Sequence, residues 1–242
     1  MADGRCKVRW LYEFIYRYEI PIWDIGPRKE LVDLVKSGRF PPGHVVCLGS
    51  GTANNAIFLA QEGFDVTAVD YARSAIELGH KRAQKAGVHI RFIQDNLTKL
   101  SYLKGSFDLL VDFGTFDDLN STERTQYVDN ILPLTHVGSL FFLWCFEWPP
   151  RWWDKFFPFP MFLEPGEAEA RFGRWFEIRR IEATENPDFS KFQPATATYL
   201  MIRKPLKPTL NLDYRGHGQP PRSLLLIPMK LVYRVRNAGL GG

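Results

Sequence analysis

Two glycines and one acid are spaced as in a nucleotide-type binding site. Gly49 and Gly51 stand in the sequence VVCLGSGTANN, between an apolar run and a helical pattern. Glycine lets the backbone approach a ligand closely, and the first turn of the following helix has free N–H groups. Nineteen residues after Gly51, a second apolar run ends at Asp70, whose carboxylate can accept both hydroxyls of a ribose. This spacing predicts an adenosine-containing cofactor; the alternative is a tight turn and an ordinary acid at a strand end.

The residues after the two glycines separate two cofactor classes. A dinucleotide site has Gly or Ala at the sixth position of Gly-x-Gly-x-x-Gly, where pyrophosphate meets the helix, but Asn54 stands there. Ala53, one residue earlier, gives Gly-x-Gly-x-Ala instead. Because S-adenosylmethionine has no phosphate to hold, this turn favours it over NAD or NADP. The sequence also shows no recognisable Tyr-x-x-x-Lys pair for hydride transfer, so an NAD(P)-dependent oxidoreductase is kept only as an alternative function.

Strand-length apolar runs alternate with helical patterns between residues 44 and 148, which is typical of a parallel sheet with crossover helices. Two later runs leave no room for a helical crossover, so they are expected to be antiparallel neighbours. The predicted fold is therefore α/β, a Rossmann-like, doubly wound, mostly parallel seven-stranded sheet with an antiparallel last strand. The expected strands are 44–48, 64–70, 90–95, 107–113, 138–146, 175–183 and 196–204, and the expected helices between them are 54–61, 72–86 and 121–132, the last capped by Ser121.

Helical patterns over 7–20 and 28–37 predict an N-terminal helical cap of about residues 1–42. The first pattern places Trp10, Leu11, Phe14, Ile15 and Tyr18 on one stripe. The domain that this cap begins is expected to cover residues 1–204. A C-terminal tail, 205–242, is expected to follow it.

Over roughly residues 20–204 the chain resembles the class I S-adenosylmethionine-dependent methyltransferase family. The segments VVCLGSGTANNAIFLA, FDVTAVDYARSAI, IRFIQDNL and FDLLVDFGTFDDL are similar to its first four motifs. The resemblance implies that Asp70 binds the ribose, that Asp95 faces the adenine amino group with Asn96 beside it, and that Asp112 and Phe113 line the methionine and adenine sides. Two positions depart from the family pattern: Cys47 replaces an acid, and Ala53 replaces the third glycine. The donor-binding residues implied in full are Trp23, Gly49, Ser50, Gly51, Asp70, Tyr71, Asp95, Asn96, Asp112 and Phe113.

A narrower resemblance is to the thiopurine and halide methyltransferase branch, which has a Trp-Asp-x-Gly stretch before the first strand. Here that stretch is Trp23 to Gly26. An aromatic face attracts a positive sulfonium, so Trp10 and Trp23 would cap the donor. The alternative is that both residues only pack a helical cap on the sheet.

The acceptor side offers weaker signals. Methyl transfer depends mainly on alignment of the reactants, so no dedicated base is required. Asp117 is the candidate catalytic residue; together with Asp118 it could orient an acceptor, although solvated acids at a helix start are the favoured interpretation. The run CFEWPPRWWDKFFPFPMF, residues 145–162, is rich in rings and follows a strand at the edge where ligands bind. It either forms an apolar wall for a small aromatic or greasy acceptor, with Tyr12, Trp148 and Trp152 as candidates, or packs internally.

Composition limits the remaining classes. The 242 residues are 45% apolar and 24% charged, and only three cysteines occur, Cys6, Cys47 and Cys145, with no Cys-x-x-Cys pair. A disulfide framework, a zinc ribbon and any other metal site are therefore not expected. No apolar run reaches the roughly 18 residues of a membrane span, which indicates a cytoplasmic protein. The net charge of +4 is too small to indicate a nucleic-acid partner.

The C-terminal tail is basic and interrupted by prolines. Residues 203–242 contain eight Lys and Arg residues against one acid, Asp213, a net charge of +7, together with the apolar stretch SLLLIPMKLVY. This combination suggests weak peripheral contact with an anionic membrane; the alternative is a tail that packs along the domain. Cys47 and the tail also keep open a non-catalytic, methyltransferase-like binding module.

Overall fold

The computed structural model describes residues 4–18, 21, 24–38, 40–150, 152, 162–181 and 196–205. Trp23, most of the aromatic and proline-rich run after residue 150, and the tail beyond Pro205 lie outside the described residues. Nothing in the structure therefore tests the predictions made for them. No helix among the described residues is long and apolar enough to cross a membrane.

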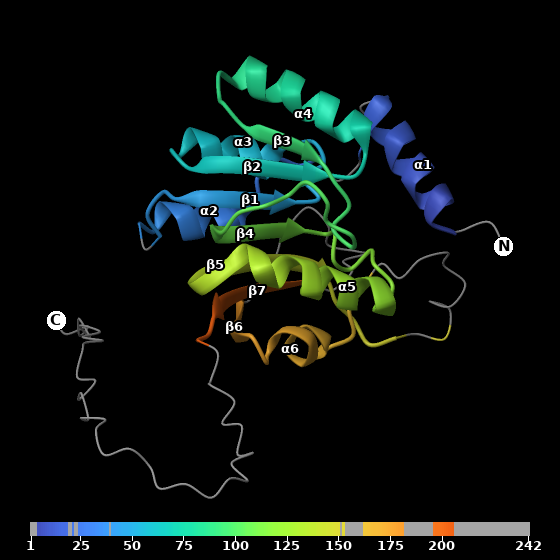
Figure 1. The fold of residues 1–242 in the computed structure, drawn as a ribbon, viewed down its shortest axis with the longest axis vertical. Coiled ribbons are helices and arrows are strands. Elements are labelled where there is room, and N and C mark those ends of the chain that lie inside the picture. Colours follow the sequence, from blue (N-terminus) through green and yellow to red (C-terminus); the bar gives the residue numbers. More distant parts are fainter. Residues whose placement is uncertain are drawn as a thin grey trace, which may run out of the picture. The chain divides into compact units, whose positions relative to one another are not determined.

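Seven strands form one mixed sheet in the order β3-β2-β1-β4-β5-β7-β6 (Figure 1). β1 to β5 run parallel, and β7 pairs antiparallel with both β5 and β6. The sheet confirms the predicted fold, including the reversed last strand. The strand bounds are β1 His44–Leu48, β2 Asp65–Asp70, β3 Arg91–Gln94, β4 Phe107–Phe113, β5 Thr135–Phe146, β6 Phe176–Ile181 and β7 Thr196–Arg203.

Helices cover both faces of the sheet, which is why its central strands are continuous apolar runs. Leu31, Phe58 and Ala83, from three helices before β3, share one core cluster with β1 and β4. Tyr127 and Phe172, from two later helices, share a second cluster with β5 and β7. The helix bounds are α1 Gly4–Arg17, α2 Lys29–Lys36, α3 Asn54–Gln61, α4 Arg73–Ala86, α5 Ser121–Ile131, the 3-10 turn η1 Leu132–Leu134 and α6 Glu167–Phe172.

Three local expectations need correction. α5 is capped by Asn120 rather than Ser121: the Asn120 side chain accepts from two backbone N–H groups, and Glu123 closes a capping box. α6 was not predicted, because six residues are too few to show a helical period. β5 begins at Thr135, three residues before the apolar run, since its first residues are exposed at the amino end of the strand.

The predicted apolar stripe of α1 does not face the core. Trp10 is 66% exposed, and Phe14 and Tyr18 form a ring stack with it along the outer side of the helix. Tyr16 is the buried residue of this helix, at 6% exposure. The alternative that Trp10 packs on the sheet is therefore wrong, and the expectation that it caps a donor stays a prediction.

α1 is attached to the start of α4, at the edge where the arrowheads of β1, β2 and β4 point (Figure 1). α4 has no side-chain cap of its own. The Glu13 carboxylate takes that place: it accepts from the backbone N–H groups of Arg73 at 2.8 Å and Ser74 at 3.0 Å, and from the Ser74 hydroxyl at 2.8 Å. An acid at a helix N-terminus also interacts favourably with the helix dipole, so this contact fixes α1 over the edge of the sheet.

Candidate functional site

The turn after β1 is shaped by two glycines. Gly49 has φ +66° and Gly51 has φ +51°, a region that favours glycine. A Cβ on Gly49 would lie 1.9 Å from the Thr115 hydroxyl, and one on Gly51 would lie 2.8 Å from the Tyr16 hydroxyl. The turn lies at the point where the sheet order reverses: β2 and β3 follow on one side of β1, and β4 and β5 on the other. In open α/β sheets, ligands bind at such a point.

Ser50 lies between these glycines and has an unusual hydroxyl. Its backbone N–H donates to the Val69 carbonyl at 2.8 Å, which ties the turn to the end of β2. The Ser50 Oγ is buried and has no hydrogen-bond partner among the described residues. Since a buried polar atom without a partner is costly, this hydroxyl fits a turn that completes its hydrogen bonds with a bound ligand.

Ala53 ends the turn in a strained conformation. It is the N-cap of α3 with φ +65°, the one non-glycine residue with positive φ among those described, and it is fully buried. The departure from a third glycine therefore costs backbone energy, about 1–2 kcal/mol for an L residue in this region. The fold nevertheless keeps the turn that the glycine would make.

Asp70 closes β2 directly against the glycine turn. Its carboxylate accepts from the Gly51 N–H and the Ala72 N–H, both at 2.9 Å. Burial raises the pKa of Asp70 to about 6, although these two bonds oppose the shift. The Tyr71 N–H also interacts with this carboxylate. Since a carboxylate has about four acceptor positions, capacity remains for a further donor such as a hydroxyl.

Three tyrosines and an acid from distant segments meet above Asp70. Tyr12 of α1 stacks with Tyr16 at 6.1 Å between ring centroids and meets the Tyr71 ring edge-on at 6.0 Å. The Tyr12 hydroxyl donates to the Asp118 carboxylate. Burial raises the pKa of Asp118 to about 6, and this hydrogen bond opposes the shift. α1 is thereby joined to the loop after β4 across the glycine turn.

The segment before α2 is attached to the same turn, a connection that sequence reasoning missed. The Asp24 carboxylate accepts from the Thr52 hydroxyl at 3.0 Å and the Asn54 amide, and it pairs with Arg82 at 2.7 Å. The Trp-Asp-x-Gly stretch pointed to this segment, but as a source of the Trp23 ring rather than of an acid that fixes the turn.

Asp95 holds the loop that follows β3. Its carboxylate accepts backbone N–H groups of the four residues Asn96, Ser101, Tyr102 and Leu103. Desolvation raises the pKa of Asp95, but these four bonds outweigh it and hold the pKa below its usual range. With its acceptors used in this way, the expected contact with an adenine amino group stays a prediction.

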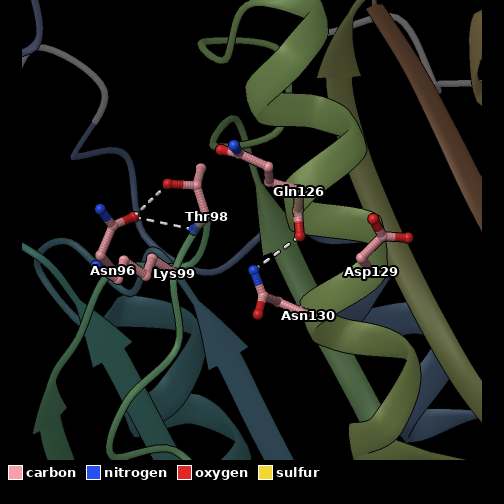
Figure 2. Close-up of a pocket in the computed structure, with 6 residues that line it drawn as sticks. All are labelled: Asn96, Thr98, Lys99, Gln126, Asp129 and Asn130. Atoms are coloured by element: carbon pink, nitrogen blue, oxygen red, sulfur yellow. Dashed lines mark hydrogen bonds between the residues drawn. The ribbon is translucent and has the colours of Figure 1, made fainter.

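Asn96 bonds within that same loop, which lies beside α5. Its side-chain oxygen accepts from the Thr98 N–H and hydroxyl, both at 2.9 Å. These residues line an open polar pocket of about 280 Å³ between the loop and α5 (Figure 2). Its lining is Asn96, Thr98, Lys99, Gln126, Asp129 and Asn130. This pocket contains no residue of the glycine turn, so it is separate from the candidate site.

Asp112 lies beneath the edge rather than on it. It is fully buried, accepts from the Tyr127 hydroxyl at 2.5 Å and the Thr115 N–H at 2.9 Å, and has a pKa raised to about 7 by burial. The expectation that Asp112 lines the methionine side of a donor stays a prediction. Phe113, the next residue, is half-buried and packs on the Trp144 ring at 4.4 Å between centroids.

Asp117 and Asp118 are not solvated helix-start acids, so that expectation is wrong. Asp117 is 1% exposed; one carboxylate oxygen accepts from the Phe146 N–H at 2.9 Å, and the other is buried without a partner among the described residues. Burial raises the pKa of Asp117 well above its usual range. This acid is sealed below the end of β5, whereas Asp118 reaches Tyr12 at the site.

A row of aromatic rings in contact runs from Phe113 along the end of β5. We call this row the ring ladder; its members are Phe113, Trp144, Phe146, Trp148 and Phe162. Neighbouring centroids are 4.4 to 6.0 Å apart. Trp148 therefore belongs to the predicted ring-rich edge, while Trp152 is 71% exposed.

Cys47, in β1, is a buried core residue whose pKa burial raises to about 12, so it contributes no charge.

Comparisons with known proteins agree with this geometry. Residues 45–138 match the family described as "Methyltransferase domain". An uncharacterized methyltransferase of Schizosaccharomyces pombe is 26% identical over 116 residues, which are 48% of this chain and 79% of that protein. The 2-heptyl-1-hydroxyquinolin-4(1H)-one methyltransferase of Mycobacteroides abscessus is 26% identical over 146 residues, 57% of this chain, and the chain spans 64% of that relative's length.

The solved structures show the same fold. The 1,6-didemethyltoxoflavin-N1-methyltransferase of Burkholderia thailandensis, solved with its substrate and S-adenosylhomocysteine, has a TM-score of 0.64 and 19% identity. The comparison covers 84% of this chain and 91% of that one. At this identity the likeness concerns the fold.

Proposed function

We propose that this chain, a class I S-adenosylmethionine-dependent methyltransferase, transfers the donor's methyl group to a small aromatic molecule. The observation that carries the proposal is the ring ladder, which stands at the carboxyl ends of β4 and β5, beside the glycine turn. Flat apolar acceptors stack on such rings, with ring pairs worth about 0.5–1.5 kcal/mol beyond area burial. Small-molecule acceptors also appear in the names of two similar proteins, from Mycobacteroides abscessus and Burkholderia thailandensis.

The donor site would be formed by the turn and by the end of β2. The remaining acceptor capacity of Asp70 suits a ribose hydroxyl, and the unpartnered Ser50 hydroxyl suits a polar group of the donor. Tyr16, whose hydroxyl lies beside Gly51, and Tyr71, the residue after Asp70, would enclose the adenosine. When bound, S-adenosylmethionine supplies an electrophilic methyl group on a positive sulfur.

The chain's own contribution to the reaction is alignment and exclusion of water. Closure of α1 through Tyr12 and Asp118 keeps solvent from the reacting atoms, and the aromatic rings interact favourably with the positive sulfonium. The new bond forms to the acceptor atom while the carbon–sulfur bond breaks, and a neutral acceptor then loses a proton. Asp118, bonded to Tyr12 and with a pKa raised to about 6 by burial, would receive it. Asp117 is sealed beneath β5, so its proposed catalytic role would require an opening of this edge.

The test is methyl transfer by the full chain from radiolabelled S-adenosylmethionine to a panel of phenols, thiophenols and hydroxyquinolines. The proposal expects labelled product with at least one aromatic acceptor and tight S-adenosylhomocysteine binding by calorimetry. Donor binding with no product from any aromatic acceptor would instead favour the non-catalytic binding module. A preference for iodide or a thiopurine would place the chain in the halide or thiopurine branch.

The C-terminal tail remains a separate proposal, of weak contact with an anionic membrane. The support is the charge of residues 205–242, six Lys and Arg against Asp213, together with their apolar stretch. Co-sedimentation with anionic but not neutral vesicles, lost on truncation after Lys204, is the expected result. If the full chain fails to pellet with anionic vesicles at low salt, the tail has no such role.

A further inference from the structure

Arg28 is a half-buried cation that forms no close ion pair with a described residue, and the Glu30 carboxylate interacts with it only through space. Its guanidinium lies over the Phe113 ring at 4.2 Å and over the Trp144 ring at 4.1 Å from each centroid. Its Nε is buried and unpartnered, and the Arg28 side chain makes no ion pair or hydrogen bond with any residue that the structure describes. Burial lowers the pKa of Arg28 to about 10, which leaves it charged at neutral pH.

The other arginines at comparable depth are all satisfied within the described chain. Arg82 pairs with Asp24, Arg124 and Arg171 pair with Glu167, and Arg203 donates to the Trp175 carbonyl. Leaving a half-buried charge without a hydrogen-bonded partner costs free energy that aromatic stacking recovers only in part. Arg28 therefore stands out as a cation whose partner is to be sought outside the described protein.

The position of Arg28 indicates whether its missing anionic partner belongs to the methyl donor or to the acceptor. Its backbone N–H donates to the Asn55 side chain at 3.1 Å, which holds it beside the start of α3. Its guanidinium rests on the first two rings of the ring ladder, on β4 and β5. The expected ribose acid, Asp70, is on β2, across β1 from this point, so the guanidinium lies on the acceptor side of the edge.

We propose that Arg28 binds an anionic oxygen group, such as a carboxylate, on the aromatic acceptor. The guanidinium lies over the two rings and no described residue accepts from its N–H groups, so a planar carboxylate can take two of them at once. An aromatic acid would then lie in the same plane as the guanidinium, with its ring along the ring ladder. This assignment rests on the proposed function, since it names the charge of the same acceptor.

The test compares two flat probes that differ only in charge, 2-naphthoate and 2-naphthamide. Calorimetry is done with the full chain saturated with S-adenosylhomocysteine, so turnover is not needed. We expect 2-naphthoate to bind about tenfold more tightly, as for a charge-assisted pair. Arg28→Gln should remove this preference, and Arg28→Lys, which lacks the planar fork, should keep part of it. Arg179→Gln, which deletes an exposed arginine on β6, should leave the preference intact.

Several results would overturn the assignment. Equal binding of the two probes to the unaltered chain, or no binding of 2-naphthoate at millimolar concentration, refutes it without any variant. An undiminished preference in a folded Arg28→Gln chain also refutes it. If Arg28→Gln weakens S-adenosylhomocysteine but not 2-naphthoate, the guanidinium serves the donor instead. Failure of the proposed function is distinct, because it appears as missing product in the acceptor panel while probe binding is unaffected.

Discussion

Acidic residues at the carboxyl ends of the strands can both stabilise a loop and be available to a ligand. Asp70 holds the turn through Gly51 and Ala72 while keeping acceptor positions open, and Asp95 uses its acceptors to order a loop. Both acids were expected to touch the donor because both end strands. The two carboxylates differ in how many N–H groups they already accept from. The number of acceptor positions left over determines whether each can also bind a ligand.

Asp70→Asn should weaken S-adenosylhomocysteine binding about tenfold or more, because the variant presents an amide hydrogen to groups that are all donors. The affinity of the unaltered chain should also fall as pH drops below about 6, since ribose hydroxyls bond to the ionised carboxylate, whose pKa burial raises to about 6. Calorimetry at pH 7.5 and pH 5 measures both effects. Asp65→Asn, at the exposed start of the same strand, is the matched control and should change neither. Full affinity in a folded Asp70→Asn chain would remove the ribose assignment.

Ala53→Gly should stabilise the fold modestly. Relief of the left-handed conformation is worth about 1–2 kcal/mol, and loss of one buried methyl costs about 0.8 kcal/mol, so the net gain is under about 1 kcal/mol. Ala60→Gly, later in α3, should instead destabilise by about 1 kcal/mol. Urea unfolding of the three proteins gives the comparison. A loss of stability in Ala53→Gly would show that packing of the methyl outweighs backbone strain.

At the scale of elements, α1 and the segment before α2 close the site from two directions. α1 is held by Glu13 on α4 and by Tyr12 on Asp118, while Asp24 and Arg28 hold the preceding segment on α3. The Glu13 and Arg28 contacts use the first turns of α4 and α3, whereas Tyr12 reaches the loop after β4 and Asp24 bonds the residue Thr52 of the glycine turn. The site is therefore closed by contacts with both helix starts and loops.

Glu13→Ala should loosen α1. The variant removes the acceptor of two backbone N–H groups at a helix start, a loss of about 1–2 kcal/mol. We expect faster tryptic cleavage at Arg17 and weaker S-adenosylhomocysteine binding, with the core of the sheet intact by circular dichroism. Glu77→Ala, which removes an exposed acid paired with Arg73 on the same helix, is the control. Unchanged cleavage and donor affinity would mean that α1 does not cover the donor.

For the whole molecule, the buried acids determine how stability depends on pH. Burial raises the pKa of Asp112 to about 7 and that of Asp70 and Asp118 to about 6, above their unfolded values. Between about pH 4 and pH 7 the folded chain therefore binds more protons than the unfolded chain. The free energy of unfolding then falls as pH rises through this window, by at most about 1.4 kcal/mol per pH unit for each group.

In the Asp112→Asn variant, the free energy of unfolding should decrease less as pH rises. At pH 8 this variant should be more stable than the unaltered chain. The amide still accepts from Thr115 and can donate to the Tyr127 hydroxyl, so the hydrogen bonds are conserved without the buried charge. Thermal midpoints from pH 5 to pH 8 measure the difference. Asp108→Asn is the control, since the pKa of Asp108 is lowered by the His44 N–H and its effect belongs to lower pH. Parallel curves for Asp112→Asn and the unaltered chain would contradict the assignment.

The sequence by itself determined the sheet, the positions of the helices other than α6, and the glycine turn, because hydrophobic period and turn chemistry are local properties. The extents of α3 and β4 agree with the prediction residue for residue, and the reversed pairing of β7 followed from a connection too short for a helix. These features needed no knowledge of which distant residues meet.

Only the tertiary structure decided which side chains face the site. An apolar stripe on α1 predicted burial, yet Trp10 and Phe14 point outward, since it is the Tyr12 and Tyr16 face that packs on α4. Asp117 and Asp118 are adjacent in sequence but differ in surroundings, one sealed beneath β5 and the other bonded to Tyr12. Arg28 looked like any residue at a helix start. Its role depends on rings more than 80 residues away along the chain, and contacts at such a distance leave no local pattern to find.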